Sequence, residues 1–434
     1  MKLLLKGGRI VDPSQDIDET LDLLIEDGLI ARIAPNLPTP EVGRDSGTAV
    51  VDLEGKTIVP GLLDMHTHLR EPGHEYKETI LSGTAAALAG GFTAVACMAN
   101  TSPVNDNSSV TDFILRKAAR ADLARVYPVA AVSRNLEGEI LTEFSDLKDA
   151  GAVALSDDGN PVATAGLMRR ALEYAYSLSL PVISHCEDRS LTEGGAMNEG
   201  FVSTELGLPG IPAIAEDIMA ARDIAIAEYT GTRVHIAHVS TAATVELVRD
   251  AKRRGIAVTA ETAPHYFTLT DEALRSYSTD LKVYPPIRGS EDRDAVIGGL
   301  RDGTIDVIAS DHAPHSSIEK DVEFAYAATG LIGLETSLAL SLAMVEQGVI
   351  SIGRLVEAMS VNPARILGVP GGTLRTGTAA DVTVIDTTRA WTVDKNAFRS
   401  LSRNCPFHGR RLTGKALMTI VGGIIKYRED AKPL

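Results

Sequence analysis

Two histidines separated by one residue, His66 and His68, have the type and spacing of a metal-binding pair. They follow an apolar run at residues 58–63, which we predict to be a buried strand weakened by an internal proline and glycine. Side chains two positions apart in an extended chain point to the same side, so both imidazoles can face one metal ion. Arg70 continues on that side if the extension persists, and its guanidinium suits a carboxylate. The alternative is a pair of buried core histidines without a ligand role.

Further polar residues follow several later apolar runs, and they are Asn100, Asp157, Asp158, His185, His238, Asp311, His312 and His315. The predicted strands cover residues 58–63, 92–98, 125–132, 152–155, 180–184, 232–239, 256–260 and 305–309. Segments with helical periodicity, such as 168–178 and 241–254, lie between them. This alternation predicts an α/β fold of the TIM-type (β/α)8 barrel class, in which the active site gathers at the C-terminal ends of the strands.

The two ends of the chain have a different pattern, with short apolar runs separated by glycine, aspartate and proline turns. We predict that residues 1–55 and 369–434 pair into one small composite β-sandwich domain. Residues 56–368 then form the barrel with its C-terminal helices. A chain of 434 residues is long enough for both domains.

Composition narrows the class of protein. The net charge of −16 argues against nucleic acid or an anionic membrane as a partner. No apolar stretch approaches the roughly 20 residues that cross a bilayer, and the N-terminal apolar run is too short for a signal peptide. Three cysteines without a close pair fit a reducing cytoplasm. Cys186 beside His185 could be read as a nucleophile, but we expect a small buried residue.

The inventory of imidazoles and carboxylates exceeds what one metal ion needs. Imidazole and carboxylate are the usual ligands of a hydrolytic zinc ion. One ion could be held by His66, His68 and Asp311, and a second by His185 and His238, with a carboxylate from Asp157 or Asp158 between them. Two close cations stabilise the attacking and the carbonyl oxygen together. The residues alone do not separate Asp157 from Asp158.

Five segments resemble one known family. They are residues 61–73 (GLLDMHTHLREPG), 156–159 (SDDG), 184–188 (SHCED), 237–241 (AHVST) and 310–315 (SDHAPH). In this order they are similar to class I bacterial dihydroorotases of the cyclic amidohydrolase superfamily. The resemblance implies two zinc ions per subunit, bound by His66, His68, Asp158, His185, His238 and Asp311. Many relatives have a carboxylated lysine at the end of the fourth strand, and this chain has no lysine there.

The resemblance also implies a reaction, the reversible cyclisation of N-carbamoyl-L-aspartate to dihydroorotate. Hydroxide attacks the ring carbonyl, while Asp311 takes the proton and delivers it to the departing ring nitrogen. The implied substrate contacts are His68, Arg70, Asn100, Tyr284, His315, Thr329 and Gly330. Two of these depart from the family pattern, because relatives often have asparagine at position 284 and phenylalanine at 329. For His315 the alternative is a partner that orients Asp311.

Other polar residues near the strand ends, including Glu261, His265 and His312, match no ligand position, and we interpret them and His235 as structural. We expect a cytoplasmic homodimer, with aspartate transcarbamoylase as a candidate partner. Two competing hypotheses remain, a hydantoinase or allantoinase and an inactive scaffold subunit for the transcarbamoylase. The missing lysine and Arg70 argue against the first, and the complete ligand set argues against the second.

Overall fold

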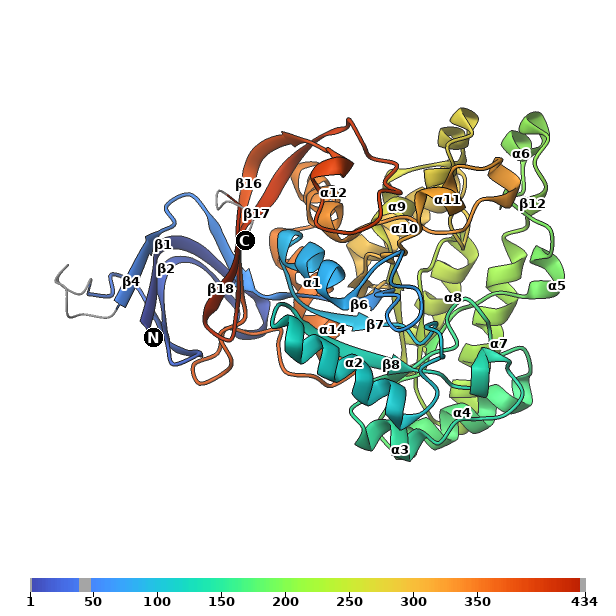
Figure 1. Ribbon diagram of the computed structural model, residues 1–434, viewed down its shortest axis with the longest axis horizontal. Coiled ribbons are helices and arrows are strands. Elements are labelled where there is room, and N and C mark those ends of the chain that lie inside the picture. Colours follow the sequence, from blue (N-terminus) through green and yellow to red (C-terminus); the bar gives the residue numbers. More distant parts are fainter. Residues whose placement is uncertain (1, 39–47, 430–434) are drawn as a thin grey trace.

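The computed structural model describes residues 2–38 and 48–429 (Figure 1). Residues 1, 39–47 and 430–434 of the predicted terminal β-sandwich lie outside the described residues. The division of the chain into two domains stays a prediction.

Strands from both ends of the chain share one mixed sheet, in which the blue and red strands of Figure 1 meet. Its order is β18-β17-β16-β5-β1-β2-β3, and β4 pairs with β1. The strands are β1 (Lys2–Asp12), β2 (Ile17–Glu26), β3 (Leu29–Ala34), β4 (Thr48–Asp52), β5 (Thr57–Pro60), β16 (Val382–Thr392), β17 (Arg411–Val421) and β18 (Ile424–Arg428). The antiparallel pairing of β16 with β5 joins the two ends of the chain.

Eight further strands run parallel in two four-stranded sheets. One contains β6 (Leu62–Thr67), β7 (Phe92–Cys97), β8 (Arg125–Ala130) and β9 (Ala154–Leu155), and the other β10 (Ile183–Ser184), β13 (Val234–Ile236), β14 (Val258–Thr262) and β15 (Val307–Ile308). Isolated parallel bridges connect the two sheets, Leu155 to Val182 at one edge and Thr67 to His312 at the other. The C-terminal ends of these strands consequently lie on the same side.

The strands are apolar on both faces because both faces are buried. One core cluster contains Leu63, Met65, Ala94 and Ala96, while the neighbouring strand residues Leu62 and Phe92 belong to a second cluster shared with the helices. Strand side chains alternate between faces, so the two clusters lie on opposite sides of the parallel strands.

Helices connect and cover the parallel strands. They are α1 (Ile80–Ala89), α2 (Ser108–Ala121), α3 (Phe144–Asp149), α4 (Ala165–Ser177), α5 (Arg189–Thr192), α6 (Phe201–Leu206), α7 (Ile214–Thr230), α8 (Ala242–Arg253), α9 (Pro264–Thr268), α10 (Ser290–Asp302), α11 (Ser317–Lys320), α12 (Leu334–Glu346), α13 (Ile352–Val356) and α14 (Asn362–Leu367). A short pair, β11 (Met197–Asn198) and β12 (Gly210–Ile211), lies outside these sheets. The predicted start of α8 is confirmed, since the Thr241 side chain accepts from the Thr244 amide.

The prediction of one strand over residues 58–63 is wrong. Thr57–Pro60 is β5 of the terminal sheet, and Leu62 begins β6 of the parallel strands. A Cβ on Gly61 would lie 2.2 Å from the Thr93 hydroxyl, so only glycine fits where the chain passes between the two sheets. The apolar character on both sides of Pro60 and Gly61 does not reveal this change of sheet, because both strands are buried.

The shift places His66 inside β6, with His68 just beyond it. The extension does not persist to Arg70, whose φ is 62°. Among the described residues, no helix is both long and apolar enough to cross a membrane.

Candidate metal centre and substrate cavity

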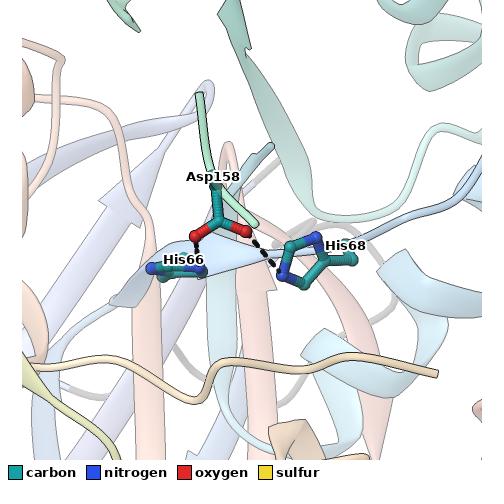
Figure 2. A group of neighbouring side chains, drawn as sticks. All are labelled: His66, His68 and Asp158. Atoms are coloured by element: carbon teal, nitrogen blue, oxygen red, sulfur yellow. Dashed lines mark ion pairs between the residues drawn. The ribbon is translucent and has the colours of Figure 1, made fainter. Parts of the chain in front are cut away.

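Asp158 lies just beyond β9, with four imidazoles around its carboxylate. The distances to its oxygens are 3.3 Å from His66 Nε2, 3.4 Å from His68 Nε2, 3.5 Å from His185 Nδ1 and 3.4 Å from His238 Nε2. Figure 2 shows the His66 and His68 rings on either side of the carboxylate. Residues from four separate strand ends thus meet at one point.

Asp311, just beyond β15, completes the group of six predicted ligands. Its Oδ1 lies 3.4 Å from His68 Nε2 and 3.7 Å from His66 Nε2. The structure therefore brings together all six side chains that the resemblance assigned to metal binding, and all six are buried.

Asp157 is turned away from this cluster. Its carboxylate accepts hydrogen bonds from the backbone amide and the hydroxyl of Ser133, the first at 2.9 Å. It therefore stabilises the loop after β8. Of the two adjacent aspartates, only Asp158 faces the imidazoles, which is a choice that the residues alone left open.

The outward nitrogen of three imidazoles has its own hydrogen-bond partner. His66 Nδ1 lies 2.5 Å from Glu261, His68 Nδ1 2.8 Å from the Asn100 side-chain oxygen, and His185 Nε2 2.9 Å from Glu187. A hydrogen bond at one ring nitrogen sets the tautomer and leaves the other nitrogen as a lone-pair donor.

Glu187 and the role of Glu261 were missed by the sequence analysis. Both residues lie near predicted strand ends, and that position was the available signal. The interpretation of Glu261 as purely structural is too narrow, since its carboxylate orients His66.

Two residues of the cluster and the nearby Arg70 have left-handed backbone conformations, with φ of 33° at His238, 47° at Asp311 and 62° at Arg70. Such conformations are unfavourable for non-glycine residues and persist where the surroundings impose them, often at functional sites. Each follows a strand end, so the chain turns sharply there and presents its side chain to the centre.

The residues of the cluster fit a bound cation, because some of their buried polar atoms have no hydrogen-bond partner in the protein. His66 Nε2 and Asp158 Oδ1 are buried without a hydrogen-bond partner, although buried polar atoms are normally paired. Burial alone would raise the pKa of Asp158, but the neighbouring His66, with His185 and His238 at 3.5 and 3.4 Å from Oδ1, holds it well below its usual range. An ionised carboxylate among imidazole nitrogens is a donor set for a divalent metal. His66, His68 and Asp158 form one such group, and Asp158, His185 and His238 a second.

A cavity of about 180 Å³ adjoins the cluster. Its lining includes all the predicted substrate contacts, namely His68, Arg70, Asn100, Tyr284, His315, Thr329 and Gly330, together with Asp158 and Asp311. The Tyr284 hydroxyl donates to the Gly195 carbonyl at 3.4 Å, so the side chain is held at the cavity wall.

Arg70 carries the positive charge of this cavity. Its Nε donates to the Pro314 carbonyl at 3.2 Å, and Nη2 lies 3.3 Å from His315 Nε2. Burial lowers the pKa of Arg70 to about 10, so the guanidinium stays charged at neutral pH. His315 Nε2 also lies 2.9 Å from the Thr329 carbonyl, and these contacts place it with Arg70 and the 329–330 backbone.

Cys186 is buried, and burial raises the pKa of its thiol well above the usual range. A nucleophile needs the thiolate form, so the expectation of a small buried residue agrees with this environment.

Comparison with known proteins agrees with this arrangement. A family model described as dihydro-orotase-like matches residues 55–244. The chain is 59% identical over 431 residues to a dihydroorotase of Syntrophus aciditrophicus, covering 99% of this chain and 100% of the relative. It is 54% identical to a dihydroorotase of Geobacter metallireducens, with the same coverage. The chain belongs to the dihydroorotase family.

The resemblance to this family seen in the five segments is thereby confirmed, while the class I subtype is not tested. Among solved structures, an L-hydantoinase (dihydropyrimidinase) from Arthrobacter aurescens is similar, with a TM-score of 0.88 and 25% identity. The match covers 100% of this chain and 97% of the hydantoinase.

Proposed function

We propose that this protein is a metal-dependent dihydroorotase. It catalyses the reversible cyclisation of N-carbamoyl-L-aspartate to (S)-dihydroorotate and water in pyrimidine biosynthesis. The observation that carries the proposal is the ring of four imidazoles around Asp158, with Asp311 beside it, at the wall of a cavity that also contains Arg70. Identity above 50% to dihydroorotases over nearly the whole chain supports the same reaction.

The proposed cofactor is a pair of zinc ions, which His66, His68, Asp158, His185, His238 and Asp311 would hold between them. When bound, such cations supply Lewis acidity toward a carbonyl oxygen and lower the pKa of water. The mixture of imidazole and carboxylate donors favours zinc, although cobalt or manganese ions accept similar ligands.

The protein's own residues provide binding and proton transfer. Arg70 binds the substrate carboxylate through its guanidinium, with His315 beside it. The Asn100 side-chain amide donates to a substrate oxygen while its carbonyl holds His68. Asp311 accepts the proton of the attacking water and delivers it to the ring nitrogen that departs, and the same groups act in reverse during cyclisation.

Several finer features remain proposals. We propose that the eight parallel strands form a closed barrel, supported by the bridges at both edges of the two sheets. Membership of class I is supported by Asp158 at the end of the fourth parallel strand, where many relatives have a lysine. The composite terminal domain, a homodimer, association with aspartate transcarbamoylase and a cytoplasmic location follow from the sequence and the family.

The decisive experiment combines metal analysis with turnover in both directions. We expect about two zinc ions per chain and turnover of both N-carbamoyl-L-aspartate and dihydroorotate. A protein with bound metal that hydrolyses hydantoin or allantoin in preference to dihydroorotate would overturn the assignment in favour of the related cyclic amidohydrolases. A protein without metal and without turnover would indicate a scaffold subunit.

A further inference from the structure

The segment 328–330 forms one wall of the substrate cavity through Thr329 and Gly330, and it has no helix or strand of its own. All three of its carbonyl oxygens nevertheless accept hydrogen bonds. The Thr329 carbonyl lies 2.9 Å from His315 Nε2. The Ala328 carbonyl accepts from the Lys320 side chain, and the Gly330 carbonyl accepts from the Asn404 side chain. Segments without regular structure are usually the most mobile parts of a fold, whereas these hydrogen bonds restrain segment 328–330.

Lys320, the last residue of α11, points its ammonium group into the protein. Its Nζ donates to the carbonyl oxygens of Ala328 at 2.7 Å and Gly330 at 2.9 Å, with Lys282 O more distant at 3.5 Å. The side chain is only 5% exposed. Burying an ammonium group is unfavourable unless acceptors surround it, and here those acceptors are mainly the backbone of segment 328–330.

Asn404, which follows segment 328–330 in the sequence, binds the same segment. It belongs to residues 399–404, the tail segment, which lies between β16 and β17 of the terminal sheet. Its Nδ2 donates to the carbonyls of Gly330 and Ala313, both at 3.0 Å, and its Oδ1 accepts from the His315 amide at 3.2 Å. One amide thus binds the loop after β15 and the segment 328–330 together, and it is 3% exposed.

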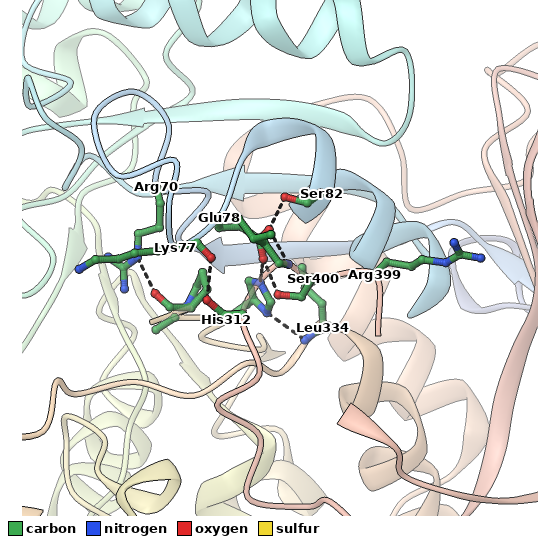
Figure 3. Close-up of polar contacts among 12 residues, drawn as sticks. Arg70, Lys77, Glu78, Ser82, His312, Leu334, Arg399 and Ser400 are labelled. Carbon is green, nitrogen blue, oxygen red and sulfur yellow. Dashed lines mark hydrogen bonds and ion pairs between the residues drawn. The ribbon is translucent and has the colours of Figure 1, made fainter. Parts of the chain in front are cut away.

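The tail segment is itself anchored beside the catalytic residues. Ser400 donates its hydroxyl to Glu78, which also lies 3.3 Å from His312 Nε2 (Figure 3). His312 directly follows Asp311. Ser402 donates to the Lys77 carbonyl at 2.6 Å. These hydrogen bonds hold the tail segment, and with it Asn404, in place.

The approach of Gly330 to the loop after β15 leaves no room for a side chain. Its φ is +142°, and an added Cβ would lie 2.7 Å from both the Cβ and the carbonyl oxygen of Ala313. Gly330 permits this approach because it has no side chain, and Asn404 holds it by binding both carbonyls, together with the hydrogen bond from the Ala313 amide to the Leu331 carbonyl at 2.7 Å. The geometry is that of a preformed wall.

We propose that Lys320 and Asn404 are positioning residues that hold segment 328–330 against the substrate cavity. Thr329 and Gly330 are then in place before the substrate arrives, which lowers the entropy lost on binding. Neither residue lines the cavity beside the metal cluster, so both act through the backbone they bind. The proposal rests on the proposed dihydroorotase function for its kinetic consequences, but not for its structural one.

The test uses Lys320→Met and Asn404→Ala in the full-length, metal-loaded protein, with Asn404→Asp as a milder variant that keeps the acceptor for the His315 amide. Thr419→Val is the matched control, because it removes a buried hydrogen bond, from the Thr419 hydroxyl to the Leu88 carbonyl at 2.7 Å, that belongs neither to segment 328–330 nor to the tail segment. Hydrogen–deuterium exchange of the amides of residues 328–332 measures directly how firmly this segment is held. Steady-state kinetics with dihydroorotate measure the effect of the restrained segment on KM and kcat.

We expect exchange in 328–332 to rise about tenfold or more in the Lys320 and Asn404 variants. KM should rise about tenfold while kcat changes less than about threefold, since binding is affected more than chemistry. The control should change neither. Unchanged exchange in folded variants, or an equal change in Thr419→Val, would overturn the proposal. If a variant does not fold, the Asn404→Asp protein gives the same comparison. Absence of turnover in the unaltered protein would refute the function, whereas the exchange data would still decide the positioning role.

Discussion

At the scale of single residues, the centre depends on how its imidazoles are oriented. His66 has Glu261 on one ring nitrogen and Asp158 near the other, at 2.5 Å and 3.3 Å. Glu261 is fully buried and also lies 3.3 Å from His235 Nε2. A buried carboxylate between two histidines fixes one tautomer of His66 and raises the basicity of its free nitrogen.

Removal of this carboxylate should weaken metal binding. We expect Glu261→Ala to lower metal affinity about tenfold to a hundredfold, measured by competition with a coloured chelator. Glu173→Ala is the control, because Glu173 forms only a surface ion pair with Arg169. An affinity equal to that of the unaltered protein would show that Glu261 does not orient His66.

Asp311 is the residue that we propose transfers the proton. We expect Asp311→Asn to lower kcat for dihydroorotate by about a hundredfold to ten-thousandfold, the usual contribution of general acid–base catalysis. Asp157→Asn is the matched control, since Asp157 is also an acidic residue at a strand end but binds Ser133. Its kcat should stay within about threefold. Metal content is measured for both, and similar kcat values in the two variants would contradict the assigned role.

At the scale of elements, α11 supplies the Lys320 ammonium group and the tail segment supplies the Asn404 amide, and both bind segment 328–330, which has no regular structure. Lys320 illustrates the electrostatic consequence, because burial lowers its pKa from 10.5 to about 8. The charged groups that act on it are Asp280, Lys282 and Glu319. Its ammonium form is thus less favourable in the folded state than in the unfolded chain.

This shift predicts a pH dependence of stability. Between pH 8 and 10.5 the unfolded chain keeps the Lys320 proton and the folded state loses it, so the unfolded state binds more protons. The free energy of unfolding should therefore rise with pH relative to Lys320→Met, by up to about 1.4 kcal/mol per pH unit. Below pH 8 both states are protonated and the difference should stay constant. Urea unfolding at pH 7, 8.5 and 9.5 measures it, and a difference that falls or stays flat above pH 8 would count against the shift.

At the scale of the whole molecule, the terminal sheet is attached to the parallel strands by partly and fully buried polar contacts. Asp381, just before β16, accepts from Arg125 of β8 at 2.8 and 3.1 Å and from the Gly422 amide at 2.7 Å. Thr383 donates its hydroxyl to the Gly91 carbonyl at 2.6 Å. These contacts hold the sheet whose β16–β17 connection reaches the catalytic edge.

Loss of the Asp381 carboxylate should lower stability without changing the chemistry. We expect Asp381→Ala to lower the free energy of unfolding by about 1–3 kcal/mol, because the Gly422 amide and Arg125 lose their acceptor. Glu173→Ala is the control, since Glu173 pairs with Arg169 at an exposed position inside α4. Unfolding in urea measures the difference, and kcat at saturating dihydroorotate should remain within about twofold. Equal stability of the two variants would show that this attachment is not important.

Much of the site was predictable from local pattern. The alternation of apolar runs and helical segments predicted the parallel strands and α8, and the polar residues after those runs predicted the cluster of His66, His68, His185, His238 and Asp311. This works because side-chain direction in a strand and the common edge of parallel strands are properties of short segments. The same local view could not show that Gly61 separates two sheets.

The hydrogen-bond partner of each side chain was decided only by the tertiary structure. Asp157 and Asp158 are equivalent in the sequence, yet one binds Ser133 and the other faces the imidazoles. The partners Glu261 for His66 and Asn404 for Gly330 lie 195 and 74 residues away. By itself the amino-acid sequence determined which chemistry the chain contains and at which edge it gathers. Which carboxylate enters the centre, and what holds its walls, depends on packing between distant segments, because a side chain's polar atoms bind whatever the fold places within about 3 Å.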